Sequence, residues 1–499
     1  MSTTQRPNHW SGHLSGVSPD DVDLTGQVSL PAAWSARWRA APSAPVLRDP
    51  DGTWLSGGEL LESTSAVAGR LAAAGASPGD RVLVTGVASN ALVVAHCAAL
   101  RAGMVVVPLN PAASRRELQS VIADARPVVA IVGPERLAGW AAEADSDLVV
   151  TSPEVPLAGG PVPALDAVTR GDPGLVMYTS GTTGAPKGAE LSHQNLLAGA
   201  ESVRIAWGWT DEDRLILSLP LSHIHGLGIG LHGALLSGGS ALLFDRFDPD
   251  SVLGAAEHGA TMFFGVPTMY ERLASADGVA RLGALRLCVS GSAPLDAELH
   301  RRIEARSGQV VLERYGMTET LLLVSNPLHG ERRAGTVGFP LPGVDLRLDE
   351  QTGEILVRGP SVFAGYRGHP ELHATAFVDG WFRTGDIGDV DDGYLRIVGR
   401  AKELIITGGY NVYPREVEDV LRAYPGVRDA AVVGTASSEW GETVSAYVEA
   451  HAALDTDALL SYAAGQLAPY KRPRFVYVVD ELPRNLLGKV QKERLAPPR

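Results

Sequence analysis

The stretch Tyr178–Gly188, with the sequence YTSGTTGAPKG, follows a short apolar run, Leu175–Tyr178, and combines glycines, hydroxyl side chains and one lysine. Glycine permits turns with positive φ that bring backbone N–H groups close to phosphate oxygens, hydroxyls add donors, and Lys187 adds a positive charge. The hydroxyl donors are Thr179, Ser180, Thr182 and Thr183, and the glycines between them are Gly181 and Gly184. This chemistry predicts a strand that leads into a loop around the phosphates of a nucleotide.

The position of Lys187 argues against a Walker A loop. That motif reads G-x-x-x-x-G-K-[ST] and opens a helix, whereas Lys187 lies three residues after Gly184 and is followed by Gly188. A P-loop NTPase is therefore disfavoured. Considered by itself, the loop has a simpler alternative, a Gly/Thr-rich surface turn.

Further motifs follow the loop in a fixed order. They are RYGMTET (Arg314–Thr320), WFRTGD (Trp381–Asp386), GRAKELI (Gly399–Ile405) and PRNLLGK (Pro483–Lys489). Together they resemble the adenylate-forming superfamily of acyl-CoA synthetases, luciferases and peptide-synthetase adenylation domains, and the resemblance runs from about Leu30 to Leu495. Within it, segments such as Leu219–Leu227, Phe264–Tyr270 and Asn411–Pro414 look most like malonyl-CoA synthetases.

The composition is that of an ordinary globular protein. Of 499 residues, 45% are hydrophobic and 20% charged, and the formal net charge of -14 argues against a nucleic-acid-binding protein. Cys97 and Cys288 each lie in an apolar stretch, so we expect two reduced thiols in a cytoplasmic protein. We expect no signal peptide and no membrane span, because the apolar run Ala91–Leu100 is too short to cross a bilayer. A monomer or a homodimer is expected.

Short β-branched runs such as Arg81–Thr85 alternate with helix-like stretches such as Gly58–Ala74, which is typical of parallel sheets covered by helices on both faces. The expected fold is therefore α/β, with layered, mostly parallel sheets. After about residue 360, short strands and turns, including Asp391–Gly393, indicate a small β-barrel-like part. We expect an N-terminal extension (1–27), an acyl-adenylating domain (28–399) and a small, mobile α+β domain (400–499).

The resemblance implies which residues bind ATP. They are Thr179, Ser180, Gly181, Thr182, Thr183, Gly184, Lys187, Gly291, Ser292, Ala293, Glu313, Arg314, Tyr315, Gly316, Met317, Thr318, Asp386, Ile397, Arg400 and Lys489. Among these, Asp386 would accept both ribose hydroxyls, and Tyr315 would cover one face of adenine. Lys489, Thr318 and His223 are the catalytic candidates, with Lys489 bridging the carboxylate and the α-phosphate. Thr182 and Glu319 would hold Mg²⁺.

The acyl pocket and the CoA site are implied in the same way. The candidates for binding the acyl substrate are His223, Arg246, Arg286, Arg314 and Met317. His225 could equally be a core histidine whose hydrogen bonds are satisfied within the protein. An arginine aimed into an acyl pocket indicates an anionic substrate, because an unpaired buried guanidinium is costly, although pairing with Asp245 or Glu313 is the alternative. The residues that would contact CoA are Gly408, Gly409, Tyr410, Lys471 and Arg472. Lys402 would be the hinge about which the small C-terminal domain rotates.

The expected function is an ATP- and Mg²⁺-dependent acid:CoA ligase that acts on malonate or methylmalonate and releases AMP and pyrophosphate. Two alternatives stay open at this point. One is a ligase for medium-chain or aryl acids. The run Leu321–Val324 is also more apolar than malonate enzymes usually show, which would suit a branched or longer acid. The other is an adenylating enzyme that loads a carrier protein.

Overall fold

The computed structural model describes residues 10–14, 18, 22–24, 28–179, 187–437, 440–451, 453–485 and 488–495. The chain forms two compact units: Met1–Asp345 with Val357–Phe382, and Leu346–Leu356 with Arg383–Arg499. We call them unit 1 and unit 2. The predicted domain boundary near residue 400 stays a prediction.

Unit 1 contains a nine-stranded sheet, which is parallel except at its two ends. In spatial order its strands are β15 (Phe339–Pro340), β14 (Leu321–Ser325), β13 (Leu312–Met317), β12 (Leu287–Ser290), β11 (Met262–Gly265), β9 (Arg214–Leu217), β10 (Ser240–Leu243), β1 (Pro45–Arg48) and β2 (Trp54–Ser56). Its inner strands are short, apolar and buried, as expected for a parallel sheet covered on both faces.

A second sheet of unit 1 has seven strands. Their order is β18 (Gly365–Tyr366), β8 (Lys187–Ser192), β7 (Pro173–Thr179), β4 (Val105–Pro108), β3 (Arg81–Thr85), β5 (Val129–Val132) and β6 (Val149–Thr151). The strands β7 and β8 are antiparallel, and Thr179 pairs with Lys187. The predicted phosphate loop is therefore the connection of a hairpin and does not open a helix.

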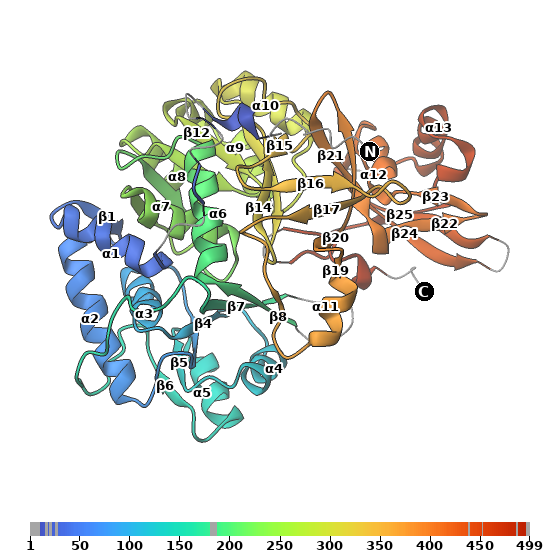
Figure 1. The fold of residues 1–499 in the computed structure, drawn as a ribbon. Helices are drawn as coiled ribbons and strands as arrows, with labels where there is room; N and C mark the ends of the chain where they lie inside the picture. Colours follow the sequence, from blue (N-terminus) through green and yellow to red (C-terminus); the bar gives the residue numbers. More distant parts are fainter. Residues whose placement is uncertain are drawn as a thin grey trace, which may run out of the picture. The chain divides into compact units, whose positions relative to one another are not determined.

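Helices cover both faces of the two sheets (Figure 1). They are α1 (Leu30–Ala40), α2 (Gly57–Ala73), α3 (Asn90–Arg101), α4 (Arg115–Ala125), α5 (Glu135–Ala144), α6 (His193–Ala206), α7 (His232–Ser237), α8 (Pro249–Glu257), α9 (Pro267–Ser275), α10 (Ala297–Ser307) and α11 (Pro370–Ala376). Capping boxes fix the starts of α2, α4 and α6, where a serine side chain accepts from the third helical residue. Because α6 contacts strands of both sheets, it joins them into one layered α/β body, as predicted.

A π-helix, His225–Leu231, leads into α7 and is completely buried. Its alternate residues are glycines, and the space beside each is filled. A Cβ at Gly226 would lie 2.5 Å from the Pro220 carbonyl oxygen, and one at Gly228 would lie 2.5 Å from Ile224. The glycines therefore let this wide helix pack closely against the chain that precedes it.

The strands of unit 2 belong to two five-stranded sheets, the first of which also includes strand residues of unit 1. The first contains β16 (Asp345–Leu348), β17 (Glu354–Arg358), β20 (Trp381–Asp391), β19 (Phe377–Val378) and β21 (Tyr394–Arg400), and the unit boundary passes through its strands. The second contains β23 (Tyr410–Val412), β22 (Ile405–Thr407), β25 (Gly441–Ala450), β24 (Val427–Ser437) and β26 (Phe475–Val479), with helices α12 (Pro414–Arg422) and α13 (Thr456–Gln466). This mixture of helices and strands agrees with the predicted α+β C-terminal part.

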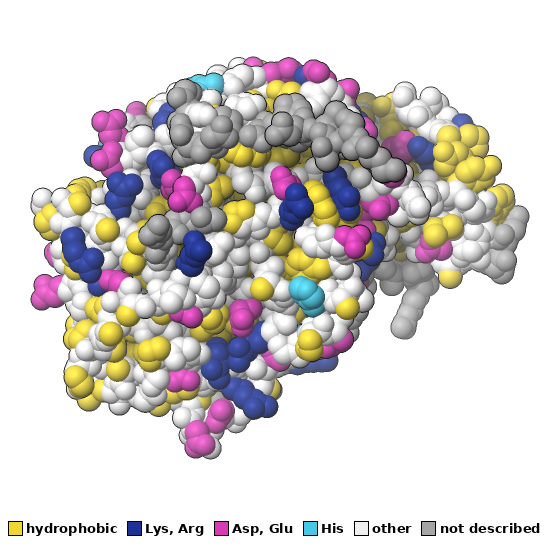
Figure 2. Space-filling view, in the orientation of Figure 1, with side chains coloured by type: hydrophobic (Ala, Val, Ile, Leu, Met, Phe, Trp, Pro, Cys, Tyr) yellow, Lys and Arg dark blue, Asp and Glu magenta, His cyan; other side chains and the backbone are white. Residues whose placement is uncertain are grey.

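Surface charge is mixed. Figure 2 shows basic and acidic side chains interspersed on the visible face, without a continuous basic stripe. Within the described residues, no helix is both long enough and apolar enough to cross a membrane.

Candidate active site

The candidate nucleotide and acyl residues of unit 1 gather at one edge of the nine-stranded sheet. Gly291–Ala293 follow β12 directly, Arg246 follows β10, and His223 follows β9, while Arg314 lies within β13. Parallel strands bring their carboxyl ends to one edge, which is where ligands bind in open α/β sheets. The sequence order of these motifs therefore becomes a spatial cluster.

Arg314 lies deep in this cluster. It is only 5% exposed, and a Cβ at Gly291 would come within 2.3 Å of its Cζ atom, so only glycine leaves room for the guanidinium. Burial lowers the pKa of Arg314 to about 9, with Glu313 acting in the opposite direction. Nε and Nη2 have no hydrogen-bond partner among the described residues. Arg314 is thus a charged, buried group that retains hydrogen-bonding capacity.

Two histidines lie near this arginine. Nδ1 of His225 is 3.2 Å from Oγ of Ser292, and burial, Arg314 and His223 together lower the pKa of His225. Burial also lowers the pKa of His223. Both rings are therefore neutral at pH 7. Sequence reasoning left His225 undecided, because its contact with Ser292 joins residues 67 positions apart.

Two non-glycine residues with positive φ border the site. Ser292 has φ +69° and Leu321 has φ +57°. Backbone strain of this kind persists only where the surrounding structure imposes it, and it is concentrated at functional sites. At Leu321 the strain accompanies the tight turn between β13 and β14, in which the Thr320 N–H donates to the Met317 carbonyl at 3.1 Å.

That turn carries Thr318 and Glu319 and is connected to the phosphate hairpin. The Tyr366 hydroxyl donates to Oε1 of Glu319 at 2.8 Å, and Nζ of Lys187 lies 6.0 Å from the centroid of the Tyr366 ring. Burial and Glu319 raise the pKa of Tyr366, so its hydroxyl remains a donor at neutral pH. Sequence reasoning missed Tyr366, which lies in an edge strand of only two residues. Ser180, Gly181, Thr182, Thr183 and Gly184 lie outside the described residues.

The remaining members of the predicted nucleotide site lie in unit 2. Asp386 in β20 pairs in register with Arg400 in β21, and Nε of Arg400 is 2.9 Å from Oδ1 of the buried Asp386. Ile397 lies on the same hairpin, opposite Gly388. The hairpin thus presents a carboxylate and a guanidinium together.

Lys489 lies close to this pair. Although Lys489 is exposed, partial desolvation and then Arg400 lower its pKa, while Glu403 and Asp386 oppose that lowering. The predicted hinge, Lys402, lies in the single 3₁₀ turn Ala401–Glu403 between β21 and β22. One compact region of unit 2 therefore contains Asp386, Arg400, the predicted hinge and the catalytic candidate Lys489.

The predicted CoA residues also come together in unit 2. The Tyr410 and Tyr470 rings stack with centroids 4.6 Å apart, which places the Gly408–Tyr410 turn beside Lys471 and Arg472. Both glycines of the turn have positive φ. Lys471 is bound by both carboxylate oxygens of Glu416 at 2.7 Å, and Arg472 donates to the Leu467 carbonyl.

The structure argues against one acyl candidate. Nε and Nη2 of Arg286 each lie 2.6 Å from an oxygen of Asp213, and Nη1 donates to the Trp207 carbonyl. Arg286 precedes β12, so it lies at the amino edge of the sheet, opposite the cluster around Gly291. The alternative of pairing with a nearby carboxylate therefore holds for Arg286. Arg246 is exposed at the carboxyl edge.

Comparison with protein families gives two adjacent matches. Residues 34–367 match the model described as AMP-binding enzyme, and residues 416–489 match the AMP-binding enzyme C-terminal domain. The chain belongs to the AMP-binding enzyme family. It is similar to a feruloyl-CoA synthase of Amycolatopsis sp (39% identity; 91% of this chain, 96% of the relative) and to the mitochondrial malonate–CoA ligase ACSF3 of Mus musculus (36%; 81% and 79%).

Among solved structures, ATP-bound MatB from Rhodopseudomonas palustris superimposes with a TM-score of 0.89 at 39% identity, covering 94% of this chain and 98% of that one. The predicted superfamily and fold are therefore confirmed. The protein is an ATP-dependent acid:CoA ligase of the adenylate-forming superfamily, and its substrates are a carboxylic acid, ATP with Mg²⁺, and CoA.

Proposed function

We propose that this ligase activates a small dicarboxylic acid, malonate or methylmalonate. In the first step a carboxylate oxygen attacks the α-phosphorus of ATP and expels pyrophosphate, which gives an acyl-adenylate. In the second step the CoA sulfur attacks the acyl carbonyl, its proton is released, and AMP leaves. The products are the acyl-CoA thioester, AMP and pyrophosphate.

The observation that supports a second carboxylate is the state of Arg314. A guanidinium that is 5% exposed and has Nε and Nη2 unpartnered is costly to bury, and an anion that binds there would offset that cost. A carboxylate matches the planar fork of a guanidinium and accepts two hydrogen bonds. Arg314 would thus favour acids with a distal anion over acids that end in an apolar group.

The neighbours of Arg314 suit a short polar acid. His225 and Ser292 contribute hydrogen-bonding groups next to it, and Nε2 of His225 has no partner among the described residues. The run Leu321–Val324, which suggested a longer or branched acid, is buried at 2% exposure or less. Leu321 packs on Gly199 and Gly228, so this run is accounted for by core packing.

The reacting groups are assigned as follows. Lys489 would bridge the attacking carboxylate and the α-phosphate, and Thr318 would donate to that phosphate, because bringing two anions together requires positive charge and donors. Lys187 would neutralise the polyphosphate, Asp386 would accept the ribose hydroxyls, and Tyr315 would cover adenine. Glu319 is a buried carboxylate of the type Mg²⁺ prefers, and the ion would supply charge for the pyrophosphate.

The thioester step would use a different part of unit 2. Rotation about Lys402 would withdraw Lys489 and bring the Gly408–Gly409 turn to the acyl group. Glycines at this turn would leave space for the narrow thiol arm of CoA. Lys471 and Arg472, beside the same turn, would meet the CoA phosphates.

The test is a competition among acids. Purified protein is incubated with ATP, Mg²⁺, CoA and a panel of malonate, methylmalonate, butyrate, octanoate, benzoate and ferulate, and the thioesters are identified by mass. We expect malonyl or methylmalonyl product, and a loss of about a hundredfold or more in kcat/KM for malonate relative to butyrate in Arg314→Met. Arg286→Ala is the matched control and should leave that ratio unchanged.

Other outcomes of this competition would identify a different substrate class or a different anion-binding residue. Preferred turnover of ferulate, benzoate or octanoate would reject the dicarboxylate and favour the aryl or medium-chain alternative, which the similarity to a feruloyl-CoA synthase supports. Adenylate formation without any CoA thioester would favour a carrier-loading enzyme. A malonate-specific loss in Arg246→Ala alone would move the distal anion site from Arg314 to Arg246.

A further inference from the structure

The turn that carries Lys489 is short and is closed on itself. Arg484 and Val490 form an isolated antiparallel bridge, and the Asn485 N–H donates to the Lys489 carbonyl at 2.9 Å. The Lys489 N–H in turn donates to Oδ1 of Asn485 at 3.0 Å. The backbone of Lys489 is therefore defined by contacts within the turn, but these contacts do not attach the turn to the rest of unit 2.

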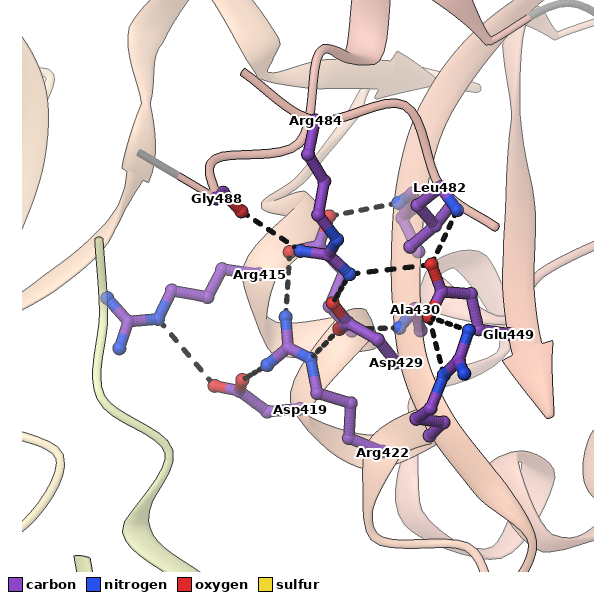
Figure 3. Close-up of polar contacts among 12 residues, drawn as sticks. Arg415, Asp419, Arg422, Asp429, Ala430, Glu449, Leu482, Arg484 and Gly488 are labelled. Carbon is purple, nitrogen blue, oxygen red and sulfur yellow. Dashed lines mark hydrogen bonds and ion pairs between the residues drawn. The ribbon is translucent and has the colours of Figure 1, made fainter. Parts of the chain in front are cut away.

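The turn is attached by Val490, which packs against the cluster of Ala431, Tyr447 and Leu482, and by the polar contacts of Arg484. Nη1 of Arg484 donates to the carbonyl of Gly488, the residue before Lys489, at 3.0 Å. Its Nη2 lies 2.5 Å from Oδ2 of Asp429 in β24 and 3.5 Å from Oε1 of Glu449 in β25. Figure 3 shows Arg484 between Gly488 on one side and Asp429 and Glu449 on the other. One guanidinium thus connects the lysine-bearing turn to two adjacent strands.

The two carboxylates are themselves fixed. Oδ1 of Asp429 accepts from Arg422 in α12 at 2.9 Å and from the Ala430 N–H at 2.7 Å. Glu449 is 4% exposed and accepts from Arg428 at 2.8 Å. Each carboxylate thus has one oxygen held by groups other than Arg484, Oδ1 of Asp429 and Oε2 of Glu449, which restricts its movement. The network is a rigid anchor for the turn.

A second anchor acts after Lys489. Nζ of Lys492 is 2.7 Å from Glu418 in α12 and 2.9 Å from Glu403 next to the predicted hinge. The turn is therefore held both before and after Lys489, which leaves the four side-chain carbons of the lysine as its main freedom. A long flexible cation benefits from such support, because a misplacement of about 1 Å costs on the order of a hundredfold in rate.

We propose that Arg484, anchored by Asp429 and Glu449, is a positioning residue that sets where Lys489 delivers its ammonium group during adenylation. This inference rests on the role proposed above for Lys489. Arg484 is not among the reacting groups assigned above and would act through the Gly488 carbonyl. Its contribution would therefore belong to the adenylation step and not to the attack of CoA, for which Lys489 is withdrawn in the function proposed above.

The test separates the two half-reactions in the full-length enzyme. Adenylation is followed by malonate-dependent ATP–pyrophosphate exchange, and thioester formation is followed by supplying synthetic malonyl-adenylate with CoA. For Arg484→Met we expect exchange kcat to fall roughly tenfold to a hundredfold with little change in KM for ATP, while thioester formation stays within about twofold of wild type. Arg484→Lys, which keeps the charge but cannot hold three acceptors in one plane, should be intermediate.

Arg428→Met is the matched control. Arg428 binds the same carboxylate, Glu449, and the Asp480 carbonyl, but among the described residues it forms no hydrogen bond or ion pair with Arg484, Asn485 or residues 488–490. Arg428 holds only Oε2 of Glu449, so its loss leaves the shorter ion pair between Arg484 and Asp429 in place. The exchange rate of Arg428→Met should therefore fall much less than that of Arg484→Met, even if its melting temperature falls. Equal losses in Arg428→Met and Arg484→Met would mean that Arg484 acts only on stability, and would overturn the inference.

Lys489→Ala separates a failure of the role proposed for Lys489 from a failure of the role proposed for Arg484. If it retains normal exchange, the role proposed for Lys489 is wrong. If it loses exchange while Arg484→Met and Arg484→Lys do not, only the positioning role is wrong. The double variant Lys489→Ala/Arg484→Met should be no slower in exchange than Lys489→Ala, because a residue that acts through Lys489 has no effect once the lysine is removed. Additive losses would contradict the inference.

Discussion

Replacing Arg314 by methionine should make the ligand-free protein more stable while removing its preference for dicarboxylates. Arg314 is buried with two guanidinium nitrogens unpartnered, and burial lowers its pKa to about 9. Because this value still lies above 7, the side chain is charged at neutral pH and the cost of burying that charge is fully present. Methionine has a similar length and carries no charge, so it removes the cost without leaving a large cavity.

The magnitude follows from the pKa. A value of about 9 lies some 3 to 4 units below the ordinary range of arginine, and each unit corresponds to about 1.4 kcal/mol, which gives an upper estimate near 5 kcal/mol. Loss of the attraction to Glu313 reduces the gain, and replacement of buried ions by apolar side chains typically stabilises by about 1–4 kcal/mol. For a chain of this size we expect the melting temperature to rise by roughly 2–6 °C.

The pH dependence has a definite sign. A cation whose pKa is lower in the folded state destabilises the fold below that pKa, and the destabilisation decreases as the pH rises through it. The stability advantage of Arg314→Met should therefore be constant between pH 6 and 8 and should shrink above about pH 9. Calorimetry without substrates at pH 7.5 and 9.5 measures both values.

Arg332 provides the matched control for this experiment. Burial also lowers the pKa of Arg332, but its guanidinium donates to the carbonyls of Pro327, Val310 and Leu328. Arg332→Met leaves those carbonyls unpaired and should lower the melting temperature. If Arg314→Met is less stable than wild type, as Arg332→Met is, then Arg314 is satisfied in the free protein and the argument for a distal anion fails.

Two further predictions concern the other substrates. Tyr366→Phe removes the 2.8 Å hydrogen bond to Glu319, so the Mg²⁺ concentration for half-maximal exchange should rise about three- to tenfold, which corresponds to about 1 kcal/mol. An unchanged Mg²⁺ titration would show that Tyr366 does not support Mg²⁺ binding. Gly408→Ala introduces a Cβ at a position with φ +55°, and that Cβ would lie 2.8 Å from the Trp440 ring. Thioester formation from malonyl-adenylate should therefore slow about tenfold or more, while ATP–pyrophosphate exchange is unaffected. A parallel loss of exchange would contradict a CoA-specific role.

Much of the fold follows from the order of apolar runs along the chain. The buried strands β3, β4 and β5 are short β-branched runs between helices, and their sequence alone predicts a parallel sheet. The hairpin nature of the phosphate loop is less evident, because Lys187–Ser192 is a strand with mixed polarity. The spatial order of nine strands in one sheet depends on crossovers, which local pattern does not determine.

The candidate site could be predicted only where a motif is contiguous. Arg314, Thr318 and Glu319 lie in one motif, whereas Tyr366 and His225 join it through contacts between distant segments. For Arg286, in contrast, the sequence predicts a site residue that the structure places elsewhere. Its sequence neighbourhood is compatible with a pocket, but the partner that engages it, Asp213, precedes a different strand at the same edge of the sheet. Pairing of two charges across strands depends on strand order, which the sequence leaves undetermined.

The buried π-helix His225–Leu231 limits how this enzyme can evolve toward other acids. Gly226, Gly228 and Gly230 each abut neighbouring atoms at distances below 3 Å for an added Cβ, so a side chain at any of them would require the surrounding core to rearrange. The intervening residues His225, Leu227 and Ile229 are also buried, at 2% exposure or less, so they tolerate replacement mainly by side chains of similar volume. A directed-evolution library for other acids should therefore keep the three glycines and vary His225, Leu227 and Ile229 only among side chains of similar volume.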